Sequence, residues 1–78
     1  MSALSDRFGA AVRGLRESRG WSQEHLAALA DLNRSYLGEI ERGVATPSIA
    51  SAAKLAGAFG WPLSRLLAQC EAPVSVPG

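Results

Sequence analysis

The 78-residue sequence has one cysteine, one histidine and no large excess of charge of either sign. Because Cys70 is alone, an internal disulfide and a cysteine metal cluster are both excluded, and a reducing cytoplasm suits the chain. His25 has no second ligand or nucleophile to work with, so we expect no enzyme, no metal site and no cofactor. A formal net charge of +1 gives no long-range field toward a nucleic acid or a membrane. The positions of the charged residues are therefore more informative about function than the net charge is.

Long apolar runs are also missing, since no stretch approaches the ~18 consecutive apolar residues of a membrane span. The first residues, MSALSDRFGA, lack a charged region followed by an apolar run, so we expect neither an export signal nor a membrane anchor. The sequence is 47% apolar and 19% charged, which is typical of one small folded domain. A chain this short buries a modest core, and self-association would stabilise it.

The apolar residues recur at helical spacing along the chain, and no alternating run is long enough to predict a strand. Polar N-caps and glycine stops divide this pattern into five helices, over residues 6–19, 23–30, 34–42, 49–59 and 62–69. The N-caps are Ser5, Ser22, Asn33 and Ser48, and the stops are Gly20, Gly43 and Gly60. We predict an all-α, compact five-helix domain over residues 1–69, followed by a flexible C-terminal tail over residues 70–78.

Each expected helix has an apolar face, which predicts the core. The residues on these faces are Phe8, Ala11, Val12, Leu15, Leu26, Leu29, Ala30, Leu37, Ile40, Ile49, Ala52, Ala53, Ala56 and Phe59. Trp21 precedes the Ser22 cap and can pack on Leu26 as a hydrophobic staple. Such a contact would fix the direction in which the chain enters the second helix.

The second and third helices are joined by a turn of three or four residues, which is the geometry of a helix-turn-helix. Helices this short cannot run antiparallel across so tight a link, so they cross steeply and the beginning of the third helix projects from the body. An α-helix fits the major groove of DNA, where each base pair presents a distinct pattern of donors and acceptors. The residues at the beginning of helix 34–42 are therefore candidates for base contacts.

The segment WSQEHLAALADLNRSYLGEIERGVATPS resembles the helix-turn-helix of the Cro and phage-repressor family, also called the xenobiotic-response-element family. The resemblance extends from about Arg13 to Leu67, which is most of the chain. The positions that carry it are Leu15, Arg16, Ser22, Gln23, Leu26, Ala27, Leu37, Ile40, Glu41, Gly43, Pro47, Ser48, Leu55 and Leu67. It implies a lambda-repressor-like domain that binds double-stranded DNA in a sequence-specific way and regulates transcription.

Three side chains of the third helix are the expected base contacts. Arg34 can donate to guanine O6 and N7, Ser35 can contact either type of edge, and Glu39 can accept from a cytosine amine. The resemblance implies base contacts at the same three positions. Each has an alternative: Arg34 could be a solvated first-turn residue, Ser35 could make no contact, and Glu39 could pair with Arg42.

Phosphate contacts are expected beside the base contacts, because they fix the register of a protein on DNA. Gln23 lies in the first turn of its helix, where the side chain and free backbone amides can bind a phosphate, and the resemblance implies the same role. Asn33 and Tyr36 are further candidates, although Asn33 could act only as an N-cap and Tyr36 only as a half-buried core aromatic. Arg42 could bind a phosphate or satisfy the C-terminus of its own helix.

Gly38 is unexpected within so short a helix, since glycine costs about 1 kcal/mol relative to alanine there. We expect it on the outward face, where a close approach to DNA would explain it. The resemblance also implies a partly buried ion pair between Arg16 and Glu41. This pair would join the first helix to the third and orient the third helix for DNA binding.

One small recognition helix binds weakly, so we expect a homodimer whose two half-sites lie about 34 Å apart on DNA. The segment WPLSRLLAQC carries more apolar residues than a helix this short can bury. The expected dimer interface consists of Trp61, Leu63, Leu66 and Leu67. The alternative is that most of them face the core, with Trp61 closing the bottom of the domain.

These predictions describe a cytoplasmic, nucleoid-associated regulator whose partner is a double-stranded operator with an inverted repeat. In size and layout the chain resembles the controller proteins of restriction-modification systems and short phage or plasmid repressors, and the sequence does not separate the two. The alternative function is an antitoxin or protein-interaction module whose main partner is another protein. No small-molecule ligand is evident.

Overall fold

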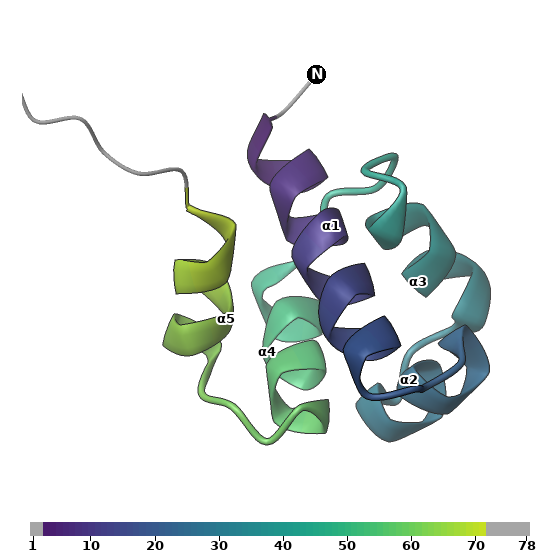
Figure 1. Cartoon of the computed structure of the whole chain (residues 1–78). Coiled ribbons are helices and arrows are strands. Elements are labelled where there is room, and N and C mark those ends of the chain that lie inside the picture. The colour runs from purple at the N-terminus through teal and green to yellow at the C-terminus, as the bar shows by residue number, and fades with distance from the viewer. Residues whose placement is uncertain (1–2, 72–78) are drawn as a thin grey trace, which may run out of the picture.

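The computed structural model describes residues 3–71, and these residues form five α-helices and no strand (Figure 1). The helices are α1 (Ala3–Ser18), α2 (Gln23–Ala30), α3 (Arg34–Glu41), α4 (Ile49–Ala58) and α5 (Leu63–Cys70). The all-α, five-helix prediction is confirmed. The last helix extends to Cys70, one residue beyond the predicted domain end, and residues 72–78 of the predicted tail lie outside the described part of the chain.

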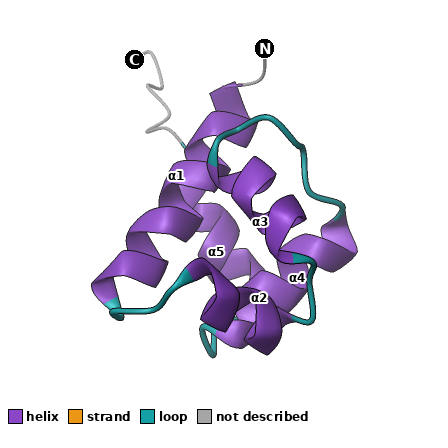
Figure 2. Ribbon diagram, turned by 90° about the vertical axis from the view of Figure 1, so that its right-hand side faces the viewer, coloured by secondary structure: helices purple, strands orange, loops and turns teal. Residues whose placement is uncertain are grey.

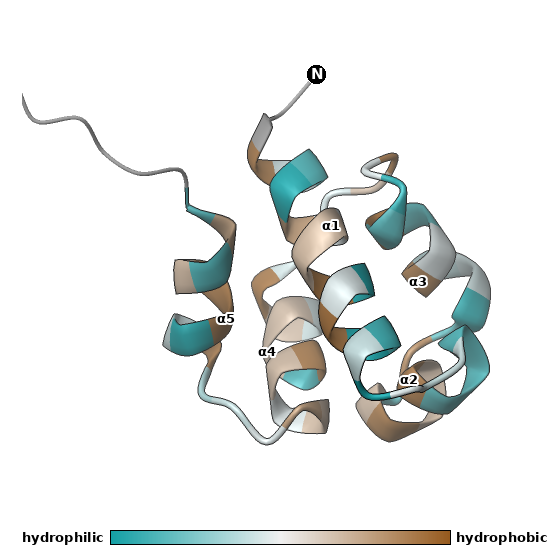
Figure 3. Ribbon diagram, viewed as in Figure 1, coloured by the Kyte–Doolittle hydropathy of each residue, from teal (hydrophilic) through white to brown (hydrophobic). Residues whose placement is uncertain are grey.

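The helices pack around the core in a closed ring, in the order α1, α3, α2, α4, α5 and back to α1. α1 lies between α3 and α5 and packs against both of them (Figure 1). Hydrophobic and hydrophilic residues interchange along each helix, as expected for helices with one buried face (Figure 3). The ring is closed at α5 by a hydrogen bond that Arg7 Nε donates to the Cys70 carbonyl oxygen at 2.7 Å.

The core contains most of the residues predicted for it, with three errors. Leu29 is 50% exposed, Ile49 is 80% exposed and Ala53 is also exposed, whereas Leu55 is fully buried in the core. Helical spacing finds an apolar face, but the neighbouring helices decide which part of it is covered. In α4 the covered stripe runs through Ala52, Leu55, Ala56 and Phe59. The first turn of α4 therefore presents Ile49 to solvent.

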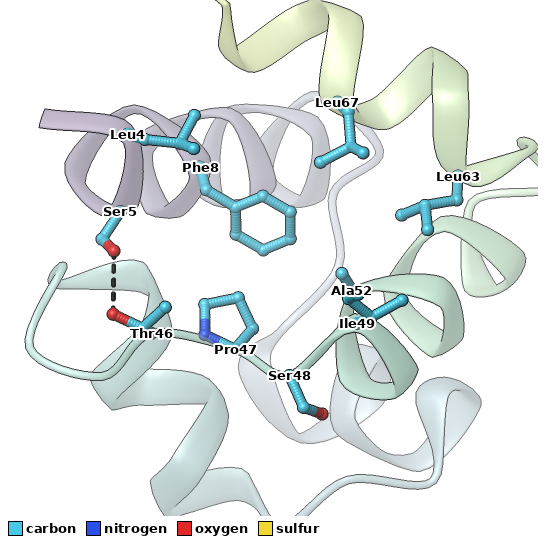
Figure 4. A pocket seen from close by; sticks show the side chains of 10 residues that line it. All are labelled: Leu4, Ser5, Phe8, Thr46, Pro47, Ser48, Ile49, Ala52, Leu63 and Leu67. Carbon is cyan, nitrogen blue, oxygen red and sulfur yellow. Dashed lines mark hydrogen bonds between the residues drawn. The ribbon is translucent and has the colours of Figure 1, made fainter. Parts of the chain in front are cut away.

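Three of the four predicted N-caps are confirmed, because the Ser22, Asn33 and Ser48 side chains each accept a hydrogen bond from a backbone amide in the first turn of their helix. The prediction for Ser5 is wrong. α1 begins earlier, at Ala3, so Ser5 is inside the helix and buried, and its hydroxyl bonds with that of Thr46 at 3.0 Å. This bond ties α1 to the loop between α3 and α4 (Figure 4).

Trp21 packs against the core that contains Leu26, and its role as a staple on Leu26 stays a prediction. Its ring stacks on Phe59 of the α4 C-cap, with centroids 5.7 Å apart and planes 2° from parallel. The Arg19 guanidinium lies over both rings and donates to the Phe59 carbonyl oxygen at 3.0 Å. The α1–α2 connection is thereby attached to the end of α4.

Candidate nucleic-acid interface

The turn between α2 and α3 depends on one unusual backbone conformation. Asp31 ends α2 in the left-handed region, with φ 55° and ψ 50°, and it is the only non-glycine residue with positive φ in the described part of the chain. Aspartate tolerates this region better than most residues do. Asn33 then begins α3 by accepting hydrogen bonds from the Ser35 and Tyr36 amides. The two helices are thus joined through a short, well-defined turn (Figure 2).

The beginning of α3 is open to solvent, as base contacts require. Arg34, Ser35 and Glu39 are all exposed. The Arg34 guanidinium lies 3.3 Å from the Glu24 carboxylate of α2, and both side chains are more than half exposed. An ion pair this exposed stabilises the fold little, so Arg34 can leave Glu24 and contact a base instead. Tyr36 is half-buried and packs against the core.

α3 is attached to the body through a buried ion pair. Arg16 of α1 donates from Nε to Glu41 Oε2 at 2.7 Å and from Nη2 to Oε1 at 3.0 Å, and the two side chains are only 12% and 3% exposed. Gln23 Nε2 donates to the same Oε1 at 3.0 Å. The hydrogen bonding that Arg16 donates to the Glu41 carboxylate is the main cause that raises the pKa of Arg16, so its guanidinium stays charged. α1, α2 and α3 therefore meet at one carboxylate.

Gly38 does not face outward, so our prediction for it is wrong. The residue is buried, and a Cβ built on it would lie 3.2 Å from Nη1 of Arg42 and 3.9 Å from Nε2 of Gln23. Arg42, at the C-cap, folds back along its own helix and covers the bare backbone of Gly38. The sequence pattern could not show this, because it depends on the side-chain direction of Arg42.

We expect Gly38→Ala to raise the melting temperature. Alanine is favoured over glycine by about 1 kcal/mol inside a helix, and the nearest side-chain atom to the new methyl group belongs to the exposed, flexible end of Arg42. Thermal unfolding followed by circular dichroism measures the change. A lower melting temperature would show that Arg42 cannot move aside.

Residues 12–66 match the helix-turn-helix family HTH_3. The chain belongs to this family. The structure superimposes on the restriction-modification controller protein C.AhdI from Aeromonas hydrophila with a TM-score of 0.79 and 42% identity, covering 83% of this chain and 98% of that one.

Two relatives of this helix-turn-helix protein are a control protein and a phage repressor. The control protein C.MunI from Mycoplasma sp is 36% identical over 72 residues, which are 91% of this chain and 97% of the relative. The immunity repressor protein of Bacillus phage phi105 is 36% identical over 61 residues, which are 78% of this chain. The chain spans only 42% of that repressor's length.

The predicted dimer face of the helix-turn-helix protein needs one correction. Leu66 is fully buried in the core and cannot contact a partner. Leu67 is 38% exposed, whereas Trp61 and Leu63 are partly buried and pack against the core. The Arg65 guanidinium also lies 4.0 Å above the Trp61 ring. The buried residues of α5 are Leu66 and Cys70, which lie about one turn apart on the side that faces the core.

An apolar groove of about 190 Å³ lies beside these residues, between α1, α5 and the loop before α4 (Figure 4). Phe8 and Pro47 form part of its lining, and Leu63 and Leu67 form the α5 side (Figure 4). Two lining residues that the sequence analysis did not assign to an interface are well exposed: Leu4 at 51% and Ile49 at 80%. Helical spacing predicts Ile49 in the core, so its exposure beside the groove could not be predicted.

Gly9 is a further residue that the sequence analysis missed. It is buried where α1 crosses α3, and a Cβ there would overlap the carbonyl oxygens of Ile40 and Glu41. The absence of a side chain lets the backbones of α1 and α3 approach closely, which brings Arg16 within reach of Glu41. The only signal in the sequence is a glycine within a helical pattern.

Residues 3–71 contain no group of three or more histidine, cysteine, aspartate or glutamate side chains that could hold a metal ion. None of their helices is long and apolar enough to cross a membrane.

Proposed function

We propose that this helix-turn-helix protein is a sequence-specific, double-stranded DNA-binding regulator of transcription that acts as a homodimer on an inverted-repeat operator. The observation that carries the proposal is the solvent-exposed beginning of α3, with Arg34, Ser35 and Glu39 available for base edges. The buried Arg16–Glu41 pair fixes α3 on the body, so these side chains are presented by a rigid element. Such a helix suits the major groove.

A controller protein of a restriction-modification system is the form of regulator that we favour. The matches to C.MunI and C.AhdI extend over nearly their whole lengths, whereas the match to the phage repressor covers less than half of that protein. In the cytoplasm such a protein would lie on the nucleoid. Whether it activates or represses depends on where its operator lies relative to the promoter.

The DNA-binding proposal can be tested by selecting bound duplexes from a random library and measuring affinities by fluorescence anisotropy. Arg34→Ala is expected to relax the preference at one base pair by about 1 to 3 kcal/mol. Gln23→Ala is expected to weaken binding to all sequences alike, since a phosphate contact carries no base information. Arg65→Ala, on α5, is the matched control and should leave the affinity unchanged.

Two outcomes would contradict this proposal. A protein that binds no duplex at low salt would remove DNA binding altogether. An Arg34→Ala variant that loses affinity equally for every sequence would show that Arg34 contacts phosphate rather than bases.

Asn33 and Tyr36 keep their proposed phosphate roles. Asn33, the N-cap of α3, is exposed, and Tyr36 in the first turn of α3 is half-buried.

We propose that the dimer forms where a second copy of the chain covers the apolar groove. This interface replaces the one predicted from the sequence, which consisted of Trp61, Leu63, Leu66 and Leu67. The groove continues the exposed side of Leu67, and Leu4 and Ile49 extend the apolar area on either side of it. Trp61 would lie at the rim. A two-fold axis would bring the same groove of both subunits together, as in most homodimers.

Ile49→Glu is expected to convert the dimer to a monomer. Ile49 is 80% exposed, so the core should stay intact, while a buried charge at the subunit interface is unfavourable. Loss of the second half-site should reduce the affinity for an inverted repeat by about 10²- to 10⁴-fold. Sedimentation velocity measures the oligomeric state. Leu29→Glu, on the exposed side of α2, is the control and should remain a dimer.

A further inference from the structure

A polar hollow of about 270 Å³ lies beside the buried ion pair, where α1, the beginning of α2 and the end of α3 meet. Its lining brings together three guanidinium groups, one amide and one carboxylate. These residues are Arg13, Arg16, Gln23, Glu41 and Arg42. Three arginines in one hollow suit an anion, because a guanidinium matches the oxygens of a phosphate with two parallel N–H donors.

The one carboxylate in the hollow is already neutralised. Both oxygens of Glu41 accept from Arg16, and Oε1 also accepts from Gln23. All three guanidinium nitrogens of Arg16 are hydrogen-bonded within the protein, since Nη1 also donates to the Trp21 carbonyl oxygen at 2.9 Å. The positive charge that remains available to a ligand comes from the other two arginines of the lining.

Arg13 and Arg42 are both free to bind an anion. Arg13 lies 3.2 Å from Glu17 on the same helix, but these side chains are 63% and 55% exposed, and such a pair is weak enough to be exchanged. Arg42 is exposed and has no ion-pair partner among residues 3–71. Its guanidinium lies along α3 above Gly38, on the side of Gln23. The two groups therefore approach one hollow from different helices.

We propose that Arg13 and Arg42 together bind a single phosphate of the DNA backbone at this hollow. α1, which precedes the helix-turn-helix, then forms part of the DNA interface. The inference rests on the proposed DNA binding and adds a residue to it, Arg13, that base recognition does not use. With the phosphate held between α1 and the end of α3, the recognition helix is fixed in the groove from its far end.

The test measures the salt dependence of binding to a labelled duplex of fixed mixed sequence, by fluorescence anisotropy on the full chain. Each phosphate that a protein neutralises contributes about 0.9 to the slope of log affinity against log salt. Because the proposal requires both guanidinium groups to hold the one phosphate, Arg13→Gln and Arg42→Gln should each lose that contact and reduce the slope by about 0.9. The double variant should then lose little more than either single variant.

Two control variants separate the site from a general effect of charge. Arg65→Gln removes the same charge on α5 and should leave the slope unchanged. Glu17→Gln releases Arg13 from its exposed partner and should increase the affinity. The melting temperature of Arg13→Gln should match that of the wild type, because the side chain it replaces is 63% exposed.

Three outcomes would contradict the phosphate site, and they can be distinguished from one another. If the wild type binds the duplex and Arg13→Gln keeps the full slope, the phosphate site is wrong while the proposed function stands. If the double variant loses about twice as much slope as either single variant, the arginines bind separate phosphates and the shared site is wrong. If the wild type binds no duplex, the proposed function and this inference fail together.

Discussion

Replacing Arg16 with alanine is expected to lower the free energy of unfolding by about 3 to 5 kcal/mol. The substitution leaves the Glu41 carboxylate, whose side chain is 3% exposed, with the Gln23 amide as its one remaining side-chain hydrogen-bond partner among residues 3–71. A buried charge without its counter-charge is strongly unfavourable. In a domain of this size each kcal/mol corresponds to about 4 to 8 °C, so the melting temperature should fall by more than about 10 °C.

Thermal unfolding of Arg16→Ala beside Arg13→Ala measures this effect on two arginines of the same helix. The Arg13 variant should change the unfolding free energy by less than about 0.5 kcal/mol, since its pair with Glu17 is exposed. A double variant, Arg16→Met with Glu41→Leu, should regain much of the loss, because it removes both charges at once. Equal melting curves for Arg16→Ala and the wild type would show that the ion pair is not structural.

Replacing Gly9 with alanine is expected to lower the free energy of unfolding, because the position has no room for a side chain. The new methyl group would overlap the Ile40 carbonyl oxygen and lie 2.8 Å from that of Glu41. Both are backbone atoms of α3, so no side chain can rotate away. Overpacking of this kind costs about 1 to 3 kcal/mol, and here it exceeds the gain of about 1 kcal/mol from helix propensity.

Gly14→Ala is the matched control, because Gly14 lies on the same helix and a Cβ there would meet no atom of the rest of the described chain within 4 Å, apart from the backbone of its own helix. Denaturant unfolding should show Gly9→Ala less stable and Gly14→Ala more stable than the wild type. The Gly9 variant should also bind DNA more weakly, since moving α1 away from α3 separates Arg16 from Glu41. A Gly9→Ala variant as stable as the wild type would mean that the two helices can separate without loss.

Local features of this fold could be predicted from the sequence, and features that depend on packing could not. The N-caps at Ser22, Asn33 and Ser48 need only the residues of one turn, so their pattern was sufficient. The prediction of Ser5 as an N-cap is wrong for a tertiary reason, because its hydroxyl forms a hydrogen bond with the hydroxyl of Thr46 in the loop before α4. Likewise, helical spacing does not reveal that Ile49 lies beyond the edge of the core.

The candidate site shows the same division. The exposure of Arg34 and Ser35 follows from the position of a short helix after a tight turn, which the sequence indicates. The environment of Gly38 depends on where the Arg42 side chain lies, and the role of Gly9 depends on how closely α1 and α3 cross. Neither can be obtained from residue spacing along one helix.

The closure of the helix ring by Arg7 and Cys70 has a consequence for how the protein is made. α1 holds Phe8 and Val12 in the core, and their environment is completed by α5, which follows the other four described helices in chain order. A nascent chain therefore cannot finish this core while α5 is still inside the ribosome. The five helices should fold as one cooperative unit only after α5 has emerged, without a stable partly folded intermediate.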